Sequence, residues 1–461
     1  MMRLPLANLW SKHRQLQKIP GPRDFGSFLN FYRNMQWDPM TYTSLLVRTY
    51  GDWVRLPFPL APMVLVADPD LFHTVIQATE QSTKKSLGYH AMELVWGGSW
   101  RAPQSLSAHS QERPRVAYDR VLEVMGPRLL REVRDIVQQL AQRCQSEIEL
   151  EISSILKEAV WILLGKVLFS LETDEAWQPL RTALECLQKA FPSLFYGLAP
   201  LPLSLPHSRD QNAQDALSLI EAFIARQILE RRHAPETNRD FLSLVMDIRD
   251  KETGRILSES QLCEEVLACL LEIQGALPAL VSLCCEHLAR DADAAELLWL
   301  EVKDRPLEDP SELQELNFAQ QVYAETLRLY PVVWSMGRVL SDDLEWKGTL
   351  FPAGTLMMLS PYHVHRNQRL WEDPERFLPQ RFEGISESSE SWQAYLPFGV
   401  GTRTHLSTDL MQLMALMFMA LFHKNFTIEP VAHSLYRLRP KLSLGIEPGV
   451  YLKFIKKCSR D

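Results

Sequence analysis

The stretch Phe318-Ala319-Gln320-Gln321-Val322-Tyr323-Ala324-Glu325-Thr326-Leu327-Arg328-Leu329 decides the fold of this chain. Its apolar residues recur at helical spacing, and Pro331 ends the predicted helix because proline cannot continue it. Glu325 and Arg328 lie three residues apart and share one face of that helix. Taken alone, they would be an ordinary surface ion pair. If their face is buried, the two charges must be closely hydrogen-bonded, because an unpaired buried charge is too costly.

A fixed series of motifs follows this helix. In order they are Tyr362, His365-Arg366-Asn367, Trp371, Pro374-Glu375-Arg376-Phe377, Pro379-Gln380-Arg381-Phe382 and Leu396-Pro397-Phe398-Gly399-Val400-Gly401-Thr402-Arg403. An elbow, Ile19-Pro20-Gly21-Pro22, stands near the start of the chain. In the order and spacing of these motifs the chain resembles the cytochrome P450 family, the haem-thiolate monooxygenases. Within that family it resembles the mitochondrial sterol and steroid hydroxylases.

The resemblance covers nearly the whole chain and implies a fold class. We expect a mainly α protein with a small β region, the cytochrome P450 fold, in one domain over residues 19–461 behind a basic tail over residues 1–18. The haem would lie between a long helix from Ser258 to Arg290 and a Met-rich helix that includes Phe422. The implied activity is hydroxylation of a sterol-like or steroid-like small molecule, with electrons supplied by a ferredoxin.

The resemblance also assigns structural roles to charged residues. Glu325 and Arg328 would pair with Arg381 in a buried triad that holds the downstream segment against the core. Arg338 would face a haem propionate, because a guanidinium group suits a carboxylate. These roles are expectations that depend on the three-dimensional arrangement.

The loop expected beneath the haem departs from the family at its centre. In the family it reads Phe-x-x-Gly-x-Arg-x-Cys-x-Gly, and the cysteine thiolate binds the iron. Phe398, Gly401 and Arg403 match this pattern, and Arg403 would face the second propionate, but His405 holds the ligand position and Ser407 replaces the last glycine. A thiolate promotes O–O cleavage, whereas histidine gives globin-like or peroxidase-like iron. His405 is therefore either a poor axial ligand or a polar residue that remains after the ligand was lost.

The long helix departs from the family as well. Members of the family place an acid and an alcohol there to deliver protons to bound oxygen. Alignment on Glu286-His287-Leu288-Ala289-Arg290 puts Gly275, Ala276 and Leu277 at that place. None of these side chains can carry a proton. Pro278 follows directly and is expected to reinforce a kink.

A further departure concerns electron delivery. Mitochondrial members use basic residues to bind an acidic ferredoxin, partly just before the Glu-x-x-Arg motif and partly after the haem loop. This chain has Gln320 and Ala324 at the first place, and Thr408 and Asp409 at the second. The charges that would steer the ferredoxin are missing, and Asp409 would repel it.

Two hypotheses with one shared fold remain. A pseudoenzyme would keep the triad after losing the axial ligand, the proton relay and the redox docking surface, and would bind a lipid, a protein partner or neither. A divergent monooxygenase would still bind haem, with His405 or a water molecule beneath the iron. Because the losses all serve one reaction while the triad is intact, we predict the pseudoenzyme.

Composition limits the remaining possibilities. The 461 residues are 46% hydrophobic and 23% charged, which is typical of a globular protein. A net charge of -8 disfavours nucleic acid as a partner. The 7 cysteines include no C-x-x-C pair, so neither a disulfide framework nor a zinc site is expected. His363 and His365 could form a metal pair on a strand, but no third ligand is suitably spaced, so we expect an ordinary structural role for both.

The N-terminal region indicates where the protein resides. Its first residues are basic and include no acidic side chain up to Arg23, which is typical of a mitochondrial presequence or its remnant, although a merely basic tail is the alternative. The apolar run from Leu413 to Phe422 is too short to cross a bilayer.

The stretch from Pro200 to Pro206 cannot be a helix and is either an apolar loop against a membrane or a buried extended segment. We therefore expect a peripheral protein of the mitochondrial inner membrane.

Local patterns predict several further elements. Runs at 53–56 and 63–67 predict a hairpin, with Asp68 as the N-cap of the next helix. The pattern from about Arg128 to Ala190 is helical. Ser258 and Gln261 form a capping box at the start of the long helix. Runs at 344–346 and 355–359 predict a β-meander.

Overall fold

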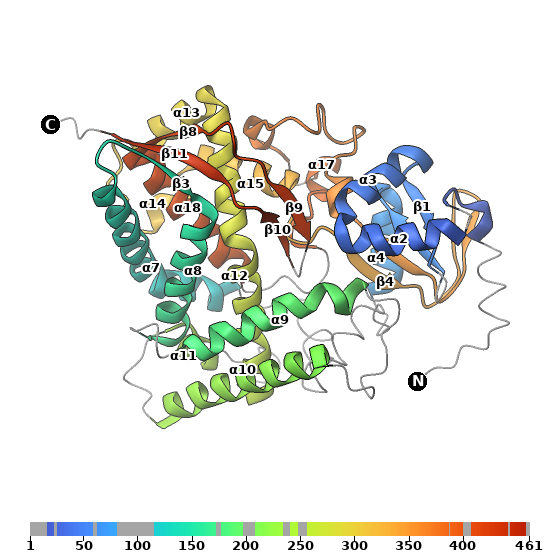
Figure 1. Cartoon of the computed structure of the whole chain (residues 1–461), viewed down its shortest axis with the longest axis horizontal. Helices are drawn as coiled ribbons and strands as arrows, with labels where there is room; N and C mark the ends of the chain where they lie inside the picture. The colour runs from blue at the N-terminus through green and yellow to red at the C-terminus, as the bar shows by residue number, and fades with distance from the viewer. Residues whose placement is uncertain are drawn as a thin grey trace.

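The structure is a computed structural model, and it describes residues 16–22, 25–58, 62–80, 115–171, 177–196, 208–233, 240–247, 256–386, 388–399, 407–440 and 443–457. Helices make up a large body on one side, and a smaller lobe on the other side combines strands with the N-terminal helices (Figure 1). The mainly α fold with a small β region is confirmed.

Four long helices pack against one another at the centre of the body. They are α7 (Arg115–Arg143), α8 (Ile152–Phe169), α12 (Glu259–Arg290) and α18 (Ser407–Asn425). Apolar residues surround α18 on every side, and its run from Leu413 to Phe422 is buried throughout, as predicted. The helices around this centre are α9 (Gln178–Tyr196), α10 (Ser208–His233), α11 (Phe241–Met246), α13 (Ala292–Val302), α14 (Ser311–Gln314) and α15 (Asn317–Leu329).

Helix α12 begins where the capping box predicts. The Ser258 side chain accepts from the Gln261 amide, and the Gln261 side chain accepts from the Ser258 amide. The helix continues through Pro278 to Arg290. By length and composition the stretch from Gln261 to Arg290 could cross a membrane, but 88% of its most apolar window is buried inside the protein. We therefore assign α12 as the core helix of the body.

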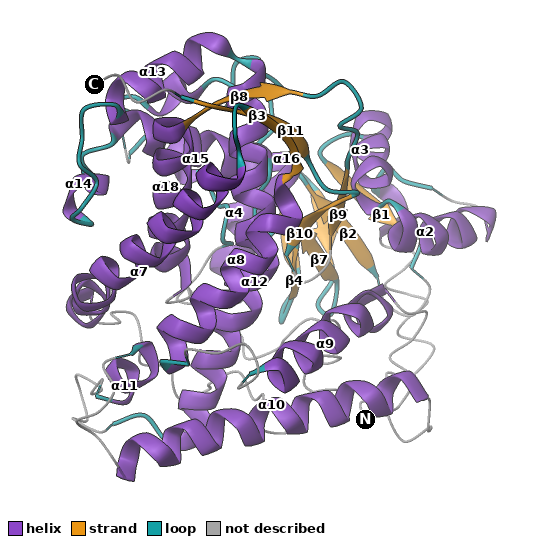
Figure 2. Ribbon diagram, turned by 60° about the vertical axis from the view of Figure 1, so that its left-hand side comes forward, coloured by secondary structure: helices purple, strands orange, loops and turns teal. Residues whose placement is uncertain are grey.

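The largest sheet has the strand order β1-β2-β7-β4. The strands are β1 (Trp53–Leu56), β2 (Met63–Val66), β7 (Leu356–Leu359) and β4 (Met336–Val339). The hairpin of β1 and β2 is confirmed, and Asp68 caps the next helix by accepting from the Leu71 amide at 2.9 Å. Figure 2 shows these strands gathered to one side of α12.

The predicted β-meander is wrong. Strands β5 (Leu344–Trp346) and β6 (Thr349–Phe351) form a separate hairpin, whereas β7 lies between β2 and β4 in the larger sheet. All four residues of β7 are buried. A strand that is apolar on both faces is typical of the interior of a sheet that is covered on both faces, and β7 occupies such an interior position.

The helical prediction for Arg128 to Ala190 is also wrong at one place. Strand β3 (Glu147–Glu151) interrupts it and pairs with β11 (Tyr451–Lys456), which in turn pairs with β8 (Phe426–Pro430). Alternation of glutamate with Ile148 and Leu150 is a strand pattern, and these two apolar residues pack against the core. A final hairpin joins β9 (Arg437–Pro440) and β10 (Leu444–Glu447).

Short helices complete the smaller lobe and the segment after β7. They are η1 (Leu16–Lys18), α2 (Phe25–Trp37), α3 (Pro39–Tyr50), α4 (Pro69–Glu80), α16 (Pro361–Val364), η4 (Pro379–Phe382) and α17 (Glu390–Gln393). The predicted apolar stretch from Pro200 to Pro206 lies outside the described residues. The basic tail up to residue 15 lies outside them as well.

The contact between α8 and a tryptophan provides a test of the packing. A Cβ added at Gly165 would lie 2.7 Å from the ring of Trp177, which is 3% exposed. Gly165→Ala should therefore lower the free energy of unfolding, because overpacking costs about 1–3 kcal/mol and exceeds the gain in helix propensity of about 1 kcal/mol. Urea unfolding measures the change. Lys189→Ala, at an exposed helical position, is the control, and an unchanged or raised stability of Gly165→Ala would contradict this packing.

Candidate functional site

The centre of the candidate site is the ion pair on α15. Arg328 Nε donates to Glu325 Oε2 at 2.7 Å, and Arg328 Nη2 donates to Glu325 Oε1 at 2.9 Å. Both side chains are fully buried. The prediction that this face lies inside is confirmed, and the alternative of a surface ion pair is wrong.

The guanidinium group of Arg328 has an acceptor for each of its five N–H groups. Besides the two bonds to Glu325, Nη1 donates to the carbonyls of His365 and Pro374 at 2.8 and 2.7 Å. Nη2 donates to the carbonyl of Arg376 at 3.2 Å. Full satisfaction of the donors is what makes a buried guanidinium tolerable.

Arg381 completes the triad. Its Nε donates to Glu325 Oε1 at 3.1 Å, and the same oxygen accepts from the amide of Leu378 at 2.8 Å. The predicted triad of Glu325, Arg328 and Arg381 is therefore present. It joins α15 to the chain segment that ends in η4.

His365 belongs to the same network, which sequence reasoning missed. Its Nδ1 donates to the carbonyl of Arg328 at 3.0 Å, and its Nε2 accepts from the amide of Leu396 at 2.8 Å. One nitrogen donates and the other accepts, so the ring is neutral. Burial lowers the pKa of His365 to about 3, which keeps it neutral. The histidine thus ties α15 to the start of the loop expected beneath the haem.

The hydrogen bonds of His363 and His365 support the expected structural role, whereas the expected placement on a strand is wrong. His363 lies on helix α16 and not on a strand, and its two nitrogens contact Ser360 Oγ at 2.7 Å and Ser44 Oγ at 3.3 Å. Within the described residues no group of three possible metal ligands occurs. Both histidines have structural partners.

The structure describes the loop expected beneath the haem as far as Gly399. Phe398 is half-buried and packs against the main core. Gly399 has φ +84, and a Cβ there would lie 2.9 Å from the methyl group of Met336. Glycine is therefore required at this turn. The residues Gly401, Arg403 and His405 lie outside the described part of the chain, and their predicted roles stay predictions.

Arg338 lies on β4 beside this loop. It is half-buried, and its Nη1 donates to the carbonyl of Gly337 at 3.1 Å. Its predicted contact with a haem propionate stays a prediction.

The middle of α12 contains no acid and alcohol pair at Gly275, Ala276 and Leu277. A Cβ at Gly275 would lie 2.8 Å from Ser443 Oγ, so the hairpin of β9 and β10 covers the helix there. The next hydroxyl along the helix, that of Ser282, donates to the carbonyl of Pro278 at 2.6 Å. This hydroxyl is therefore engaged within the helix itself.

The three buried cysteines of α12 do not supply a thiolate. Cys284 donates to Thr326 Oγ1 at 3.3 Å, and burial raises its pKa to about 12. Burial also holds the pKa values of Cys269 and Cys285 well above the ordinary range. No cysteine occurs in the sequence between Cys285 and Cys458. The residues present therefore do not fit a haem with a thiolate ligand from this loop.

The positions of the expected ferredoxin surface are neutral or acidic. Gln320 and Ala324 are half-buried on α15, and the carbonyl of Ala324 accepts from the Tyr395 hydroxyl at 3.0 Å. Asp409 is exposed in the first turn of α18. A basic side chain occupies none of these positions.

Comparisons with known proteins agree with this architecture. A sequence model of the family described as Cytochrome P450 matches residues 20–451. The chain is 23% identical over 452 residues to Cytochrome P450 3A11 of Mus musculus, covering 91% of this chain and 87% of that protein. It is 27% identical over 257 residues to Cytochrome P450 3A25 of Mus musculus, covering 54% of this chain and about half (51%) of that relative. It is 27% identical over 289 residues to Cyclooctat-9-en-7-ol 5-monooxygenase of Streptomyces melanosporofaciens, covering 61% and 62%.

The triad predicts that lysine cannot replace arginine at position 328. Lysine carries three donors on one point charge, so Arg328→Lys leaves at least two of the five buried acceptors of Arg328 without a donor. We expect a loss of about 3–5 kcal/mol in the free energy of unfolding, measured by urea denaturation. Arg226→Lys is the matched control, because the ion pair of Arg226 with Glu230 spans 2.8 Å and both side chains are exposed, and it should cost about 1 kcal/mol or less. Equal small losses in both variants would contradict the triad's role.

Buried histidines predict an acid-sensitive fold. Burial lowers the pKa values of His363 and His365 to about 3, and those of His287 and His423 to about 4. Below about pH 6.5 the unfolded chain binds protons that the folded chain does not, so stability is complete above that pH and is lost as the pH falls. Each histidine contributes a slope of about 1.4 kcal/mol per pH unit down to its folded pKa.

His423→Met tests this slope with one group. The Nδ1 of His423 bonds to Met419 within the same helix, and its Nε2 has no partner among the described residues. The substitution should flatten the dependence of the unfolding free energy on pH between 4.5 and 6 by about one proton. His433→Gln, at an exposed position, is the control. An unchanged slope in His423→Met would refute the assignment.

Proposed function

The chain belongs to the cytochrome P450 family, and on that premise we propose that it is a pseudoenzyme: a P450 fold that has lost the haem-dependent monooxygenation for which the family is known. The proposal rests chiefly on His405, which stands where the family's loop has its cysteine. The loop itself contains no cysteine. Of the described cysteines, Cys269, Cys284 and Cys285 of α12 are buried, and burial raises their pKa values. Haem would supply oxygen activation when held by a thiolate, and this chain lacks that ligand.

Two further features support the proposal. The side chains at Gly275, Ala276 and Leu277 cannot relay a proton, so cleavage of an O–O bond would lack its acid. Gln320 and Ala324 lack the positive charge that would hold an acidic ferredoxin, and Asp409 would repel one. Each loss concerns the same reaction, whereas the buried triad is intact.

We also propose what such a protein retains. Its ligand would be a hydrophobic, sterol-like small molecule, in line with the resemblance to sterol and steroid hydroxylases and with the apolar middle of α12. The basic residues of the N-terminal tail support a place in mitochondria, at the periphery of the inner membrane. Any ferredoxin contact would be weak.

The spectrum of the reduced protein with carbon monoxide tests the loss of the thiolate. We expect purified protein to carry little haem, and any haem present to give an imidazole-type band, because His405 is the one candidate ligand in the loop. Haem is quantified on the same sample. A thiolate-type band, or product formation from a sterol with a full complement of haem, would overturn the proposal.

His405→Cys is the matched variant, and His433→Cys, at an exposed histidine, is its control. We expect His405→Cys to raise the haem content severalfold and to give a thiolate-type band, because the Gly399 turn and the triad are retained. It should still produce no hydroxylated sterol, because the proton relay is missing. Full hydroxylase activity in this variant would show that α12 retains a working relay.

A further inference from the structure

Helices α2 and α3 lie side by side at the outer edge of the smaller lobe (Figures 1 and 2). Each helix packs one side against the core of that lobe. The inward side chains are Phe31 and Met35 of α2 and Met40 and Leu46 of α3, and all four are buried. The opposite sides of both helices therefore face away from the core.

The outward side of this helix pair is apolar. Leu29 and Trp37 of α2 are 56% and 67% exposed, and Leu45 of α3 is 59% exposed. Leu29 and Trp37 each stand two residues from an inward position of α2, which is about 200° around a helix, so they face the opposite way. A single exposed apolar residue is ordinary in a folded protein, whereas several on two adjacent helices form a patch.

Two exposed arginines accompany the apolar residues. Arg33 of α2 and Arg48 of α3 each stand one helical turn from one of them. Neither arginine forms an ion pair with another described residue. Asp38, the one acidic residue between the start of α2 and the end of α3, caps α3 by accepting from the Thr41 amide at 3.1 Å. Both guanidinium groups are therefore available to an anionic partner.

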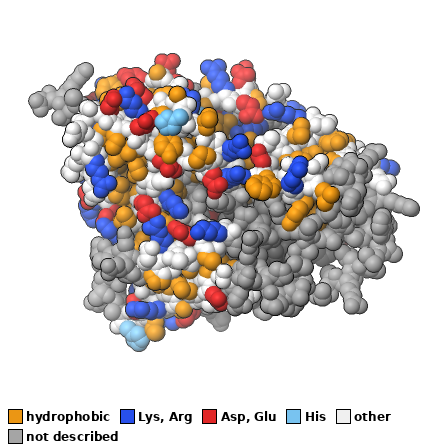
Figure 3. Space-filling model, viewed as in Figure 1, with side chains coloured by type: hydrophobic (Ala, Val, Ile, Leu, Met, Phe, Trp, Pro, Cys, Tyr) orange, Lys and Arg blue, Asp and Glu red, His pale blue; other side chains and the backbone are white. Residues whose placement is uncertain are grey.

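The surface that these side chains form is called the α2/α3 face. It consists of Leu29, Arg33, Trp37, Leu45 and Arg48. Figure 3 shows hydrophobic and basic side chains over α2 and α3.

The sequence around this face has a charge opposite to that of the whole chain. Residues 1–56, which end with β1, contain 8 lysines and arginines, 3 aspartates and no glutamate, so their net charge is +5. The whole chain has a net charge of -8. An anionic surface attracts the positive segment and repels the rest of the protein, which orients the α2/α3 face towards that surface.

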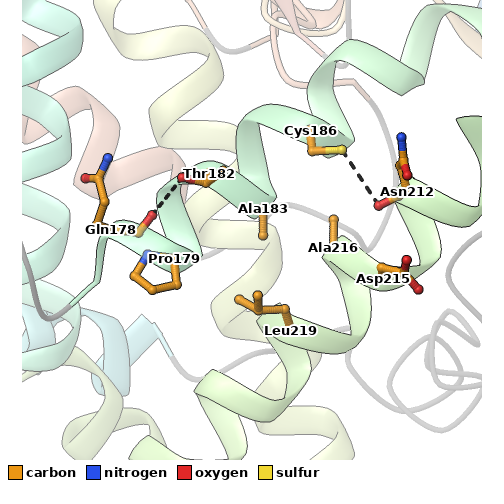
Figure 4. Close-up of a pocket in the computed structure, with 9 residues that line it drawn as sticks. All are labelled: Gln178, Pro179, Thr182, Ala183, Cys186, Asn212, Asp215, Ala216 and Leu219. Carbon is orange, nitrogen blue, oxygen red and sulfur yellow. Dashed lines mark hydrogen bonds between the residues drawn. The ribbon is translucent and has the colours of Figure 1, made fainter.

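The groove between α9 and α10 differs from the α2/α3 face (Figure 4). It also has apolar side chains, such as Ala183 and Leu219, but none of the nine residues that line it is a lysine or an arginine. Nothing in this groove would attract an anionic surface. The combination of exposed apolar residues with unpaired arginines therefore distinguishes the α2/α3 face from this groove.

We propose that the α2/α3 face attaches the protein to an anionic lipid bilayer, an inference that rests on the peripheral membrane location proposed above and names the surface responsible. Leu29 and Leu45 enter the boundary between headgroups and acyl chains, and the Trp37 ring lies at the level of the headgroups. Arg33 and Arg48 bond to lipid phosphates. A bilayer fits better than a nucleic acid, because phosphates alone would leave the exposed leucines in water.

Cosedimentation of the full-length protein with lipid vesicles tests the proposal without any dependence on haem. One preparation is phosphatidylcholine alone, and the other is equal parts of phosphatidylcholine and phosphatidylglycerol. We expect binding to the anionic vesicles to be about tenfold tighter or more, and to weaken as salt is added. Equal binding to both preparations would overturn the proposal. Absence of binding to either would overturn the peripheral membrane location as well.

Reversal of charge tests the role of the two arginines. Arg33→Glu combined with Arg48→Glu should weaken binding to the anionic vesicles by about tenfold or more. Arg226→Glu combined with Lys456→Glu is the matched control, because both side chains are exposed and lie outside the smaller lobe. The control pair should bind nearly as tightly as the unchanged protein. Equal weakening in both pairs would show that only the total charge matters and would overturn the proposal.

Removal of apolar surface tests insertion into the bilayer. Trp37→Ser combined with Leu45→Ser should weaken binding severalfold, because the apolar contact is lost. Leu229→Ser combined with Leu435→Ser, at exposed positions elsewhere, is the control. All of these positions are exposed, and matching urea midpoints confirm that the variants fold.

Two outcomes would contradict the assignment of this surface. Unchanged binding in both test pairs would place the membrane contact elsewhere, such as in the basic tail, and would leave the peripheral location standing. Weakening by the arginine pair alone would mean attraction to charge without insertion. Each outcome is independent of the haem spectrum, so failure of this inference is distinguishable from failure of the proposed loss of activity.

Discussion

The rest of the structure depends on the buried guanidinium group of Arg328. A charge in the interior is tolerable only when every donor has an acceptor, and five acceptors from four chain positions meet here. Glu325 then needs partners of its own, which Arg381 and the Leu378 amide provide. These bonds join the segment from His365 to η4 to helix α15.

This network holds the fold without using the residues that would carry the family's chemistry. The hydrogen-bond partners that satisfy Glu325, Arg328 and His365 lie at or before Leu396, ahead of the position where the family's thiolate would stand. The residues that hold the fold and the residues that would carry the reaction are therefore different. None of these bonds involves position 405, so a histidine at that position leaves each of them unchanged.

Much of the architecture follows from local signals in the sequence. The capping box at Ser258, the stop at Pro331 and the apolar run ending at Phe422 each predict an element that the structure contains. The triad was predictable only through the family resemblance, because spacing alone cannot distinguish a buried pair from a surface pair. Strand β3 was missed because helical periodicity on both sides masked five alternating residues. The pairing of β7 and the dual role of His365 depend on contacts between distant segments, which no local pattern contains.

The central claim is that the triad of Glu325, Arg328 and Arg381 holds the segment from His365 to η4 against α15 without help from haem. Amide hydrogen exchange of the full-length protein, measured without added haem, tests this claim most directly at two positions. The amides of Leu378 and Leu396 donate to Glu325 and His365, and they should exchange as slowly as amides in the middle of α12. Rapid exchange at both positions, slowed only when haem is added, would mean that the cofactor and not the ion network fixes this part of the fold.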